Sequence, residues 1–180
     1  TFCIIIILTG LYAEDRPYNL NHFAATGNLQ GVKDKISRWN INQNNNYDGW
    51  TPLHEAAMNG HFKVVKFLVR KKAKIDLKDN YGKTPLFWTC ERDYLEITTF
   101  LILKRAKIDV IDDDEITPFF SAVNHESTNV VNFLLNYGVN INVKDKQGRT
   151  PLHSAAANDN ITIIKGLIEK GAKISSKDYN

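Results

Sequence analysis

Apolar residues recur along this 180-residue chain with a period of 33 residues. Two apolar positions show the period in four successive units: Leu53, Leu86, Phe119 and Leu152 at the first, and Leu68, Leu101, Leu134 and Leu167 at the second. Polar residues keep the same spacing, since Thr-Pro begins at positions 51, 84, 117 and 150 and aspartate stands at 79, 112, 145 and 178. Such self-similarity predicts a row of small, alike units.

Each unit predicts two short helices followed by a long loop. Thr51 is a suitable N-cap and Pro52 a suitable first helical residue, and Gly60 ends this helix because glycine readily adopts a positive φ. The second helix has an apolar face with the spacing i, i+1, i+4, i+5, made by Val64, Val65, Leu68 and Val69. One helix pair cannot bury this face alone, so successive pairs are expected to stack into an all-α solenoid.

The recurring motifs resemble those of the ankyrin repeat family. They are Thr-Pro-Leu-His at 51–54 and 150–153, Ala-Ala at 56–57 and 155–156, Gly-His at 60–61, Val-Val at 64–65 and the turns at 145–148 and 171–172. The resemblance covers residues 18–180 and implies an ankyrin-repeat solenoid of helix-turn-helix units with β-turn fingers. We expect a repeat domain at 14–180, with a degenerate capping repeat at 18–48 and repeats at 49–81, 82–114, 115–147 and 148–180.

The resemblance also implies a function. Ankyrin arrays typically bind other proteins through the finger tips and the exposed side of the inner helices, because the framework residues are used in packing and the remaining positions face water on a rigid scaffold. By register, the expected partner contacts are Tyr47, Trp50, Met58, Asn59, Asn80, Tyr81, Lys83, Trp88, Glu91, Arg92, Asp113, Asp114, Ile116, Asn124, His125, Lys146, Gln147 and Arg149.

One finger departs from the pattern. Glu115 stands where the other units have glycine, so its turn is expected to be strained or of another type. It also completes an acidic run from Asp112, which could bind a divalent cation but lacks the interleaved residues of a calcium loop. We therefore expect a solvated acidic tip that meets a basic patch on the partner.

Composition and charge exclude several other functions. The net charge is +3, and the longest basic run is Arg70-Lys71-Lys72, so no clustered basic face for nucleic acid is expected. No zinc spacing, HExxH, GxSxG or phosphate-binding glycine loop is present, so we expect no enzyme, cofactor, metal site or small-molecule substrate.

His54, His61 and His153 hold recurring positions that predict scaffold hydrogen bonds, and Cys90 replaces Ala57, which predicts a buried, inert thiol.

The two ends carry separate expectations. Residues 1–13 are rich in isoleucine and resemble a secretory signal peptide, which predicts a secreted or periplasmic protein. An apolar anchor is the alternative, with a membrane as partner only if the segment is retained, and the protein is cytoplasmic if the segment is not a signal.

The isoleucines at 161–168 resemble an internal repeat, so we expect further repeats or another domain after Asn180. The array could then be a targeting or regulatory segment of a larger toxin, enzyme or membrane protein.

Overall fold

The computed structural model describes residues 19–44 and 47–179, and this part of the chain folds into ten helices without a strand. The expected signal segment at 1–13 lies outside the described residues. The helices are α2 (Leu20–Ala25), α3 (Leu29–Lys35), α4 (Pro52–Met58), α5 (Phe62–Arg70), α6 (Pro85–Glu91), α7 (Leu95–Leu103), α8 (Pro118–Asn124), α9 (Thr128–Tyr137), α10 (Pro151–Ala157) and α11 (Ile161–Glu169). None of them is long and apolar enough to cross a bilayer.

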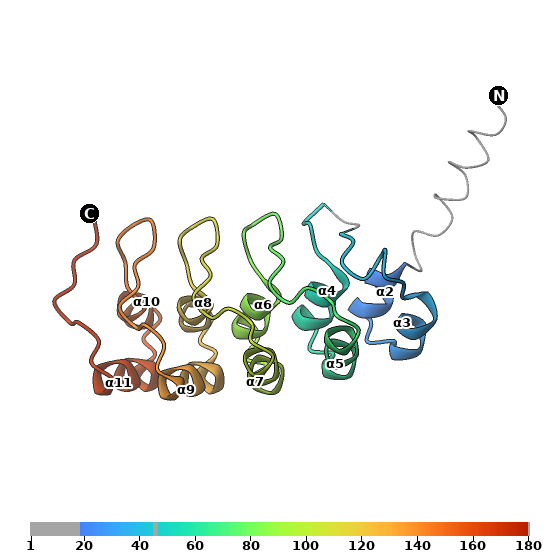
Figure 1. Ribbon diagram of the computed structural model, residues 1–180. Helices are drawn as coiled ribbons and strands as arrows, with labels where there is room; N and C mark the ends of the chain where they lie inside the picture. Colours follow the sequence, from blue (N-terminus) through green and yellow to red (C-terminus); the bar gives the residue numbers. More distant parts are fainter. Residues whose placement is uncertain (1–18, 45–46, 180) are drawn as a thin grey trace, which may run out of the picture.

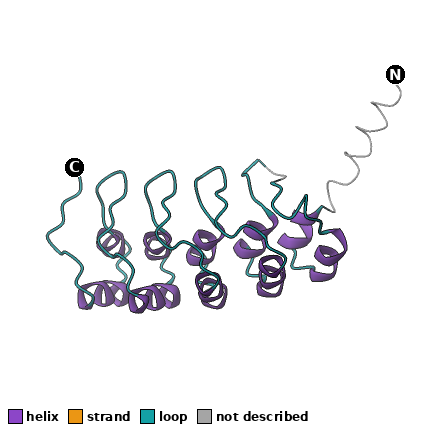
Figure 2. Cartoon of the chain, in the orientation of Figure 1, coloured by secondary structure: helices purple, strands orange, loops and turns teal. Residues whose placement is uncertain are grey.

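The helices form two parallel rows (Figure 1). The inner row runs α2, α4, α6, α8, α10, and the outer row runs α3, α5, α7, α9, α11, with each helix packed against its neighbour in the row and its partner in the pair. The loops that follow the outer helices project together from one side as fingers (Figure 2). The predicted all-α repeat solenoid is therefore confirmed.

Recurring cap residues start the inner helices as the sequence predicts. The hydroxyl of Thr51 accepts a hydrogen bond from the backbone N–H of His54, and the backbone N–H of Thr51 donates to His54 Nδ1 at 3.2 Å. Nε2 of His54 then donates to the carbonyl of Lys83 in the next repeat at 3.2 Å. His61 bonds in the other direction, to the carbonyl of Ala25 at 2.8 Å. These histidines tie neighbouring repeats together, as expected.

Two repeats use phenylalanine in place of the capping histidine. Phe87 and Phe120 are both fully buried, so apolar burial substitutes for the histidine bonds. In the repeat of Phe87, the buried hydroxyl of Thr84 has no hydrogen-bond partner within the described part of the chain, whereas the hydroxyl of Thr117 accepts the backbone N–H of Phe120. Unsatisfied buried polar atoms usually lower stability.

A continuous apolar core runs through the array. It contains the alanines and leucines at the recurring positions, and small residues such as Ala56 and Ala57 let successive inner helices approach closely. Cys90 is completely buried at the register position of Ala57, and burial raises the pKa of its thiol well above the usual range. The predicted buried thiol is confirmed. The apolar pattern continues into the last repeat, where Ile161, Ile168 and Ile174 are exposed.

Candidate functional site

The fingers are held by a repeated aspartate. One carboxylate oxygen of Asp79 accepts the backbone N–H groups of Tyr81 and Lys83, at 3.0 and 2.9 Å. Asp112 and Asp145 make the same pair of bonds two and four residues further along their own loops. Because the side chain satisfies two backbone donors within the turn, each tip is a defined structure rather than a loose loop.

Successive tips are also joined to one another. The backbone N–H of Asn80 donates to the carbonyl of Asp48 at 2.9 Å, and that of Asp113 to the carbonyl of Tyr81 at 3.1 Å. The N–H of Lys146 donates in the same way to Asp114. A second bond runs from the Tyr81 hydroxyl to a carboxylate oxygen of Asp48 at 2.9 Å, and this bond raises the pKa of the tyrosine. The tips therefore form one ledge along the array.

A cleft of about 330 Å³ lies between this ledge and the inner helices, and we call it the central cleft. It gathers eight of the expected contact residues: Tyr81, Lys83, Trp88, Asp113, Asp114, Ile116, Asn124 and His125. They come from the second and third fingers and from α6 and α8. Asp112 and Ser121 also line it, and neither was among the expected contacts, although Ser121 stands at the register position of Trp88 and could have been found from it.

Trp88 gives the central cleft an aromatic wall, and Trp50 packs against its ring. The rings of Trp50 and Trp88 meet edge to face, with 4.9 Å between their centroids. The indole N–H of Trp88 donates to Asp79 at 3.0 Å, and the ammonium of Lys83 lies 4.8 Å from the centre of its ring. Both tryptophans are partly buried, so they combine scaffold packing with an accessible edge.

Glu91 corrects one expectation. The register predicted an open position, but the side chain of Glu91 is only 6% exposed. Its carboxylate pairs with Lys83 at 2.5 Å and accepts the hydroxyl of Ser121 at 2.8 Å. The reason is that Lys83 and Ser121, from the neighbouring finger and the next repeat, close over it. Glu91 is therefore a buried partner of Lys83 and not an open position.

The remaining expected contacts lie on either side of the central cleft. Towards the first repeats, Tyr47 is fully exposed and the guanidinium of Arg92 reaches the sulfur of Met58 at 3.4 Å. Asn59 and Asn80 are exposed on the same side. Towards the last repeat, Lys146, Gln147 and Arg149 are exposed, and Arg149 pairs with Asp145 at 2.7 Å. Arg149 and Asn124 also border a smaller hollow of about 220 Å³.

The carboxylates of the third finger tip and the ammonium of Lys83 meet at the central cleft. Asp113, Asp114 and Glu115 are exposed at the third tip, whereas Asp112 is buried beneath them, and burial raises the pKa of Asp112. Within the described residues, no group of three His, Cys, Asp or Glu side chains is placed to hold a metal ion. The arrangement offers an aromatic edge, exposed carboxylates and a fixed ammonium, which suits recognition of a partner surface.

The comparisons with known proteins agree with this architecture. The family model described as Ankyrin repeats (3 copies) matches residues 20–112 and again residues 99–178. No curated protein matches the chain.

Proposed function

Because the chain belongs to the ankyrin repeat family, a family of protein-interaction scaffolds, we propose that it binds a partner protein at the central cleft and the adjoining finger tips. Ankyrin repeat domains are generally non-catalytic. The observation that carries the proposal is the convergence of eight register-predicted contact residues in one cleft. Their side chains come from rigid fingers and helices, and binding residues commonly sit on such supported loops.

The partner chemistry follows from the exposed groups around the central cleft. Asp113 and Asp114 offer carboxylates to a basic patch on the partner, and Tyr81 offers a half-exposed ring next to them. Tyrosine and arginine are common interface anchors, and charges at the rim mainly accelerate association. We place Tyr81 and Arg92 as anchors and the acidic tip as a steering element.

Export is a further part of the proposal. It rests on the apolar run between Phe2 and Tyr12, followed by Ala13 and acidic residues, which has the character of a signal peptide. A mature chain that begins after Ala13 in the secreted fraction of the producing cell supports export. A chain that keeps residues 1–13 and is found with membranes or in the cytoplasm contradicts export.

Affinity capture with a matched pair of variants tests the binding surface. The cleft variant replaces Tyr81 and Asp113 of the central cleft and Arg92 beside it with alanine, and all three are exposed, so the fold should survive. The control variant replaces Asn132, Asn136 and Lys165 with alanine, which are exposed on outer helices. A partner captured by the wild type and the control but weakened at least about tenfold by the cleft variant supports the proposal. Equal capture by all three proteins contradicts it.

A further inference from the structure

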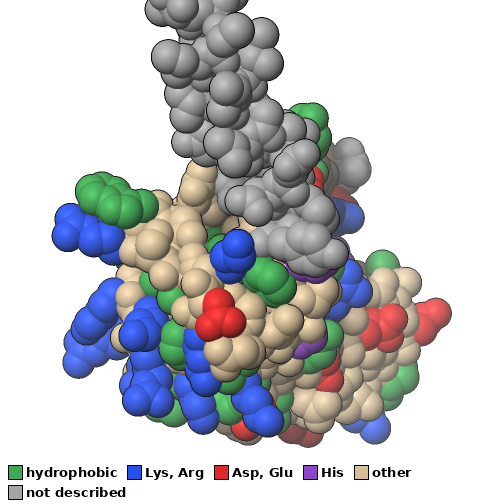
Figure 3. Space-filling view, turned by 90° about the vertical axis from the view of Figure 1, so that its right-hand side faces the viewer, with side chains coloured by type: hydrophobic (Ala, Val, Ile, Leu, Met, Phe, Trp, Pro, Cys, Tyr) green, Lys and Arg blue, Asp and Glu red, His purple; other side chains and the backbone are tan. Residues whose placement is uncertain are grey.

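A second surface lies along the ends of the outer helices. Sequence reasoning expected no clustered basic face, but the stacked fold aligns the basic runs of two repeats with each other and with Arg38 of the first unit. We call the following exposed residues the basic row: Arg38, Lys71, Lys72, Lys74, Lys104, Arg105 and Lys107. Figure 3, which views the end of the array with α2 and α3, shows Lys and Arg side chains gathered on the left and lower part of the molecule.

The basic row stops abruptly after the third repeat. Segments 71–76 and 104–109 together carry six cations and only two acids, Asp76 and Asp109. The corresponding segment of the next repeat, 137–142, reads Tyr-Gly-Val-Asn-Ile-Asn and has no charge. The row is therefore interrupted at the fourth unit, and at this register only Lys170 and Lys173 of the last repeat follow beyond the gap.

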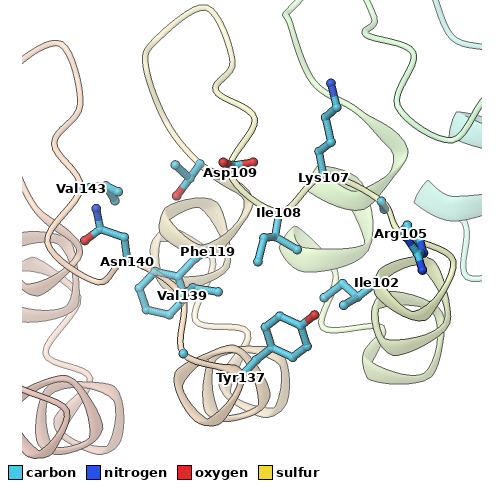
Figure 4. Close-up of a pocket in the computed structure, with 13 residues that line it drawn as sticks. Ile102, Arg105, Lys107, Ile108, Asp109, Phe119, Tyr137, Val139, Asn140 and Val143 are labelled. Carbon is cyan, nitrogen blue, oxygen red and sulfur yellow. The ribbon is translucent and has the colours of Figure 1, made fainter.

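An apolar groove opens where the basic row ends. It has a volume of about 610 Å³ and lies between the ends of α7 and α9, and we call it the outer groove. Figure 4 shows its wall of apolar side chains, made by Ile102, Ile108, Phe119, Tyr137 and Val139. Arg105 and Lys107 of the basic row border it. None of its lining residues belongs to the central cleft, so the two surfaces are separate.

Two cations of the basic row have a backbone conformation that is unfavourable for residues other than glycine. Lys72 and Arg105 have φ values of 70° and 67°, in the left-handed region that favours glycine. The other repeats place Gly138 and Gly171 at the same register, with φ values of 89° and 90°. A side chain in this conformation costs about 1 kcal/mol or more relative to glycine. The chain thus carries a cation at two positions where glycine would cost less conformational free energy.

We propose that the basic row and the outer groove together bind an acidic peptide segment of a protein, with one large apolar side chain seated in the groove. Charge complementarity favours an anionic occupant, and the apolar wall requires that the same occupant also carry an apolar group. A nucleic-acid backbone has phosphates for the row but no apolar group to fill the groove. A single anionic lipid has one headgroup and would leave the cations beyond Arg105 and Lys107 unused. An extended acidic peptide satisfies both parts at once.

Binding of defined peptides to the full chain tests this proposal. The test peptide is fluorescein-labelled Glu-Glu-Phe-Glu-Glu, its partner has Ser in place of Phe, and phosphatidylserine vesicles and a short DNA duplex are the other ligands. We expect the Phe peptide to bind about tenfold more tightly than the Ser peptide, because the ring leaves water for the groove. Tyr137→Ala, at a half-exposed wall residue, should reduce this preference without unfolding the array.

The left-handed positions allow charge to be removed without destabilising the fold. The variant Lys72→Gly with Arg105→Gly should weaken binding of the Phe peptide about tenfold while its thermal midpoint stays equal or rises. The control Lys170→Gln with Lys173→Gln removes two cations at the matching end of the last repeat, and should change affinity by no more than a factor of about two.

Several results overturn the proposal. They are no detectable binding of the Phe peptide, equal affinity for the Phe and Ser peptides, and equal weakening by the glycine variant and the control. Tighter binding of the vesicles or the DNA than of the Phe peptide, lost in the glycine variant, would assign the basic row to a lipid surface or a nucleic acid instead. The outcome does not depend on the central cleft, whose variants leave these residues unchanged.

Discussion

At the residue scale, His54 shows how a recurring side chain becomes part of the scaffold. It is completely buried between Thr51 and the carbonyl of Lys83, with Nδ1 accepting and Nε2 donating, which fixes the neutral form. Burial is the main cause of a pKa lowered below the ordinary 6.5, opposed by the nearby charge of Asp79. The unfolded chain therefore binds more protons than the folded chain between these two pKa values.

The sign of the pH effect follows from this difference. The stability that His54 contributes is fully present above its ordinary pKa and is lost as the pH falls from there towards the lower pKa of the folded state. The variant His54→Phe places at this register the residue that Phe87 and Phe120 already occupy. We expect it to lower the free energy of unfolding by about 1 kcal/mol at neutral pH, because Thr51 loses its partner.

Urea denaturation of both proteins between about pH 7.5 and about pH 5 measures the effect. The wild type should lose more stability across this range than His54→Phe. The other histidines are common to both proteins, so the difference isolates His54. Parallel pH dependence of the two proteins would show that His54 is not held neutral.

Residue identity and register alone could not place every side chain. The sequence predicted the Thr51 cap and the buried Cys90, because both depend on their own repeat. It failed for Glu91, whose burial depends on Lys83 from the finger and Ser121 from the following repeat. A register position states which face of a helix a residue occupies, but not which neighbouring side chains cover it.

At the element scale, the finger turn depends on a left-handed residue at one position. Gly49, Gly82 and Gly148 have φ values of 75°, 76° and 78° there, and Glu115 has 62°. The glutamate thus accepts the same turn and does not change its type, so the strain expected from the sequence is present. Its cost is about 1 kcal/mol.

Glu115→Gly should therefore raise the free energy of unfolding by about 1 kcal/mol. Glu115→Gln removes the charge but keeps the side chain, and separates relief of strain from relief of repulsion among the acidic residues of the tip. Asp114→Gly is a second control, since Asp114 does not have a positive φ and glycine there should destabilise the turn by about 0.5–1 kcal/mol. Chemical denaturation measures the free energy of unfolding of all three variants. If Glu115→Gln raises this free energy as much as Glu115→Gly does, the effect is due to charge and not to backbone strain.

Helices were the most predictable elements. Thr-Pro marks the start of four inner helices because it combines an N-cap with a residue suited to the first turn, and the structure begins these helices at Pro52, Pro85, Pro118 and Pro151. The finger loops were placed by the same register. Their mutual hydrogen bonds, such as that between Asp113 and Tyr81, were not predictable, because they join backbone groups about one repeat apart.

At the scale of the whole molecule, stacking creates surfaces that no single repeat contains. The central cleft uses residues from two fingers and two inner helices, and the basic row uses three outer-helix ends. Register predicted the first surface because the family's fingers and inner helices are expected to bind. It did not predict the second, since Lys71-Lys72 and Lys104-Arg105 are unremarkable pairs until the fold aligns them.

Hydrogen–deuterium exchange on the full chain, alone and bound to its captured partner, tests the central claim most directly. The account predicts that the partner slows exchange in the fingers and inner helices around the central cleft, at residues 79–92 and 112–125, while the outer helices α5, α7 and α9 exchange as in the free protein. Slowed exchange confined to the outer helices, with the fingers and inner helices unchanged, would contradict it.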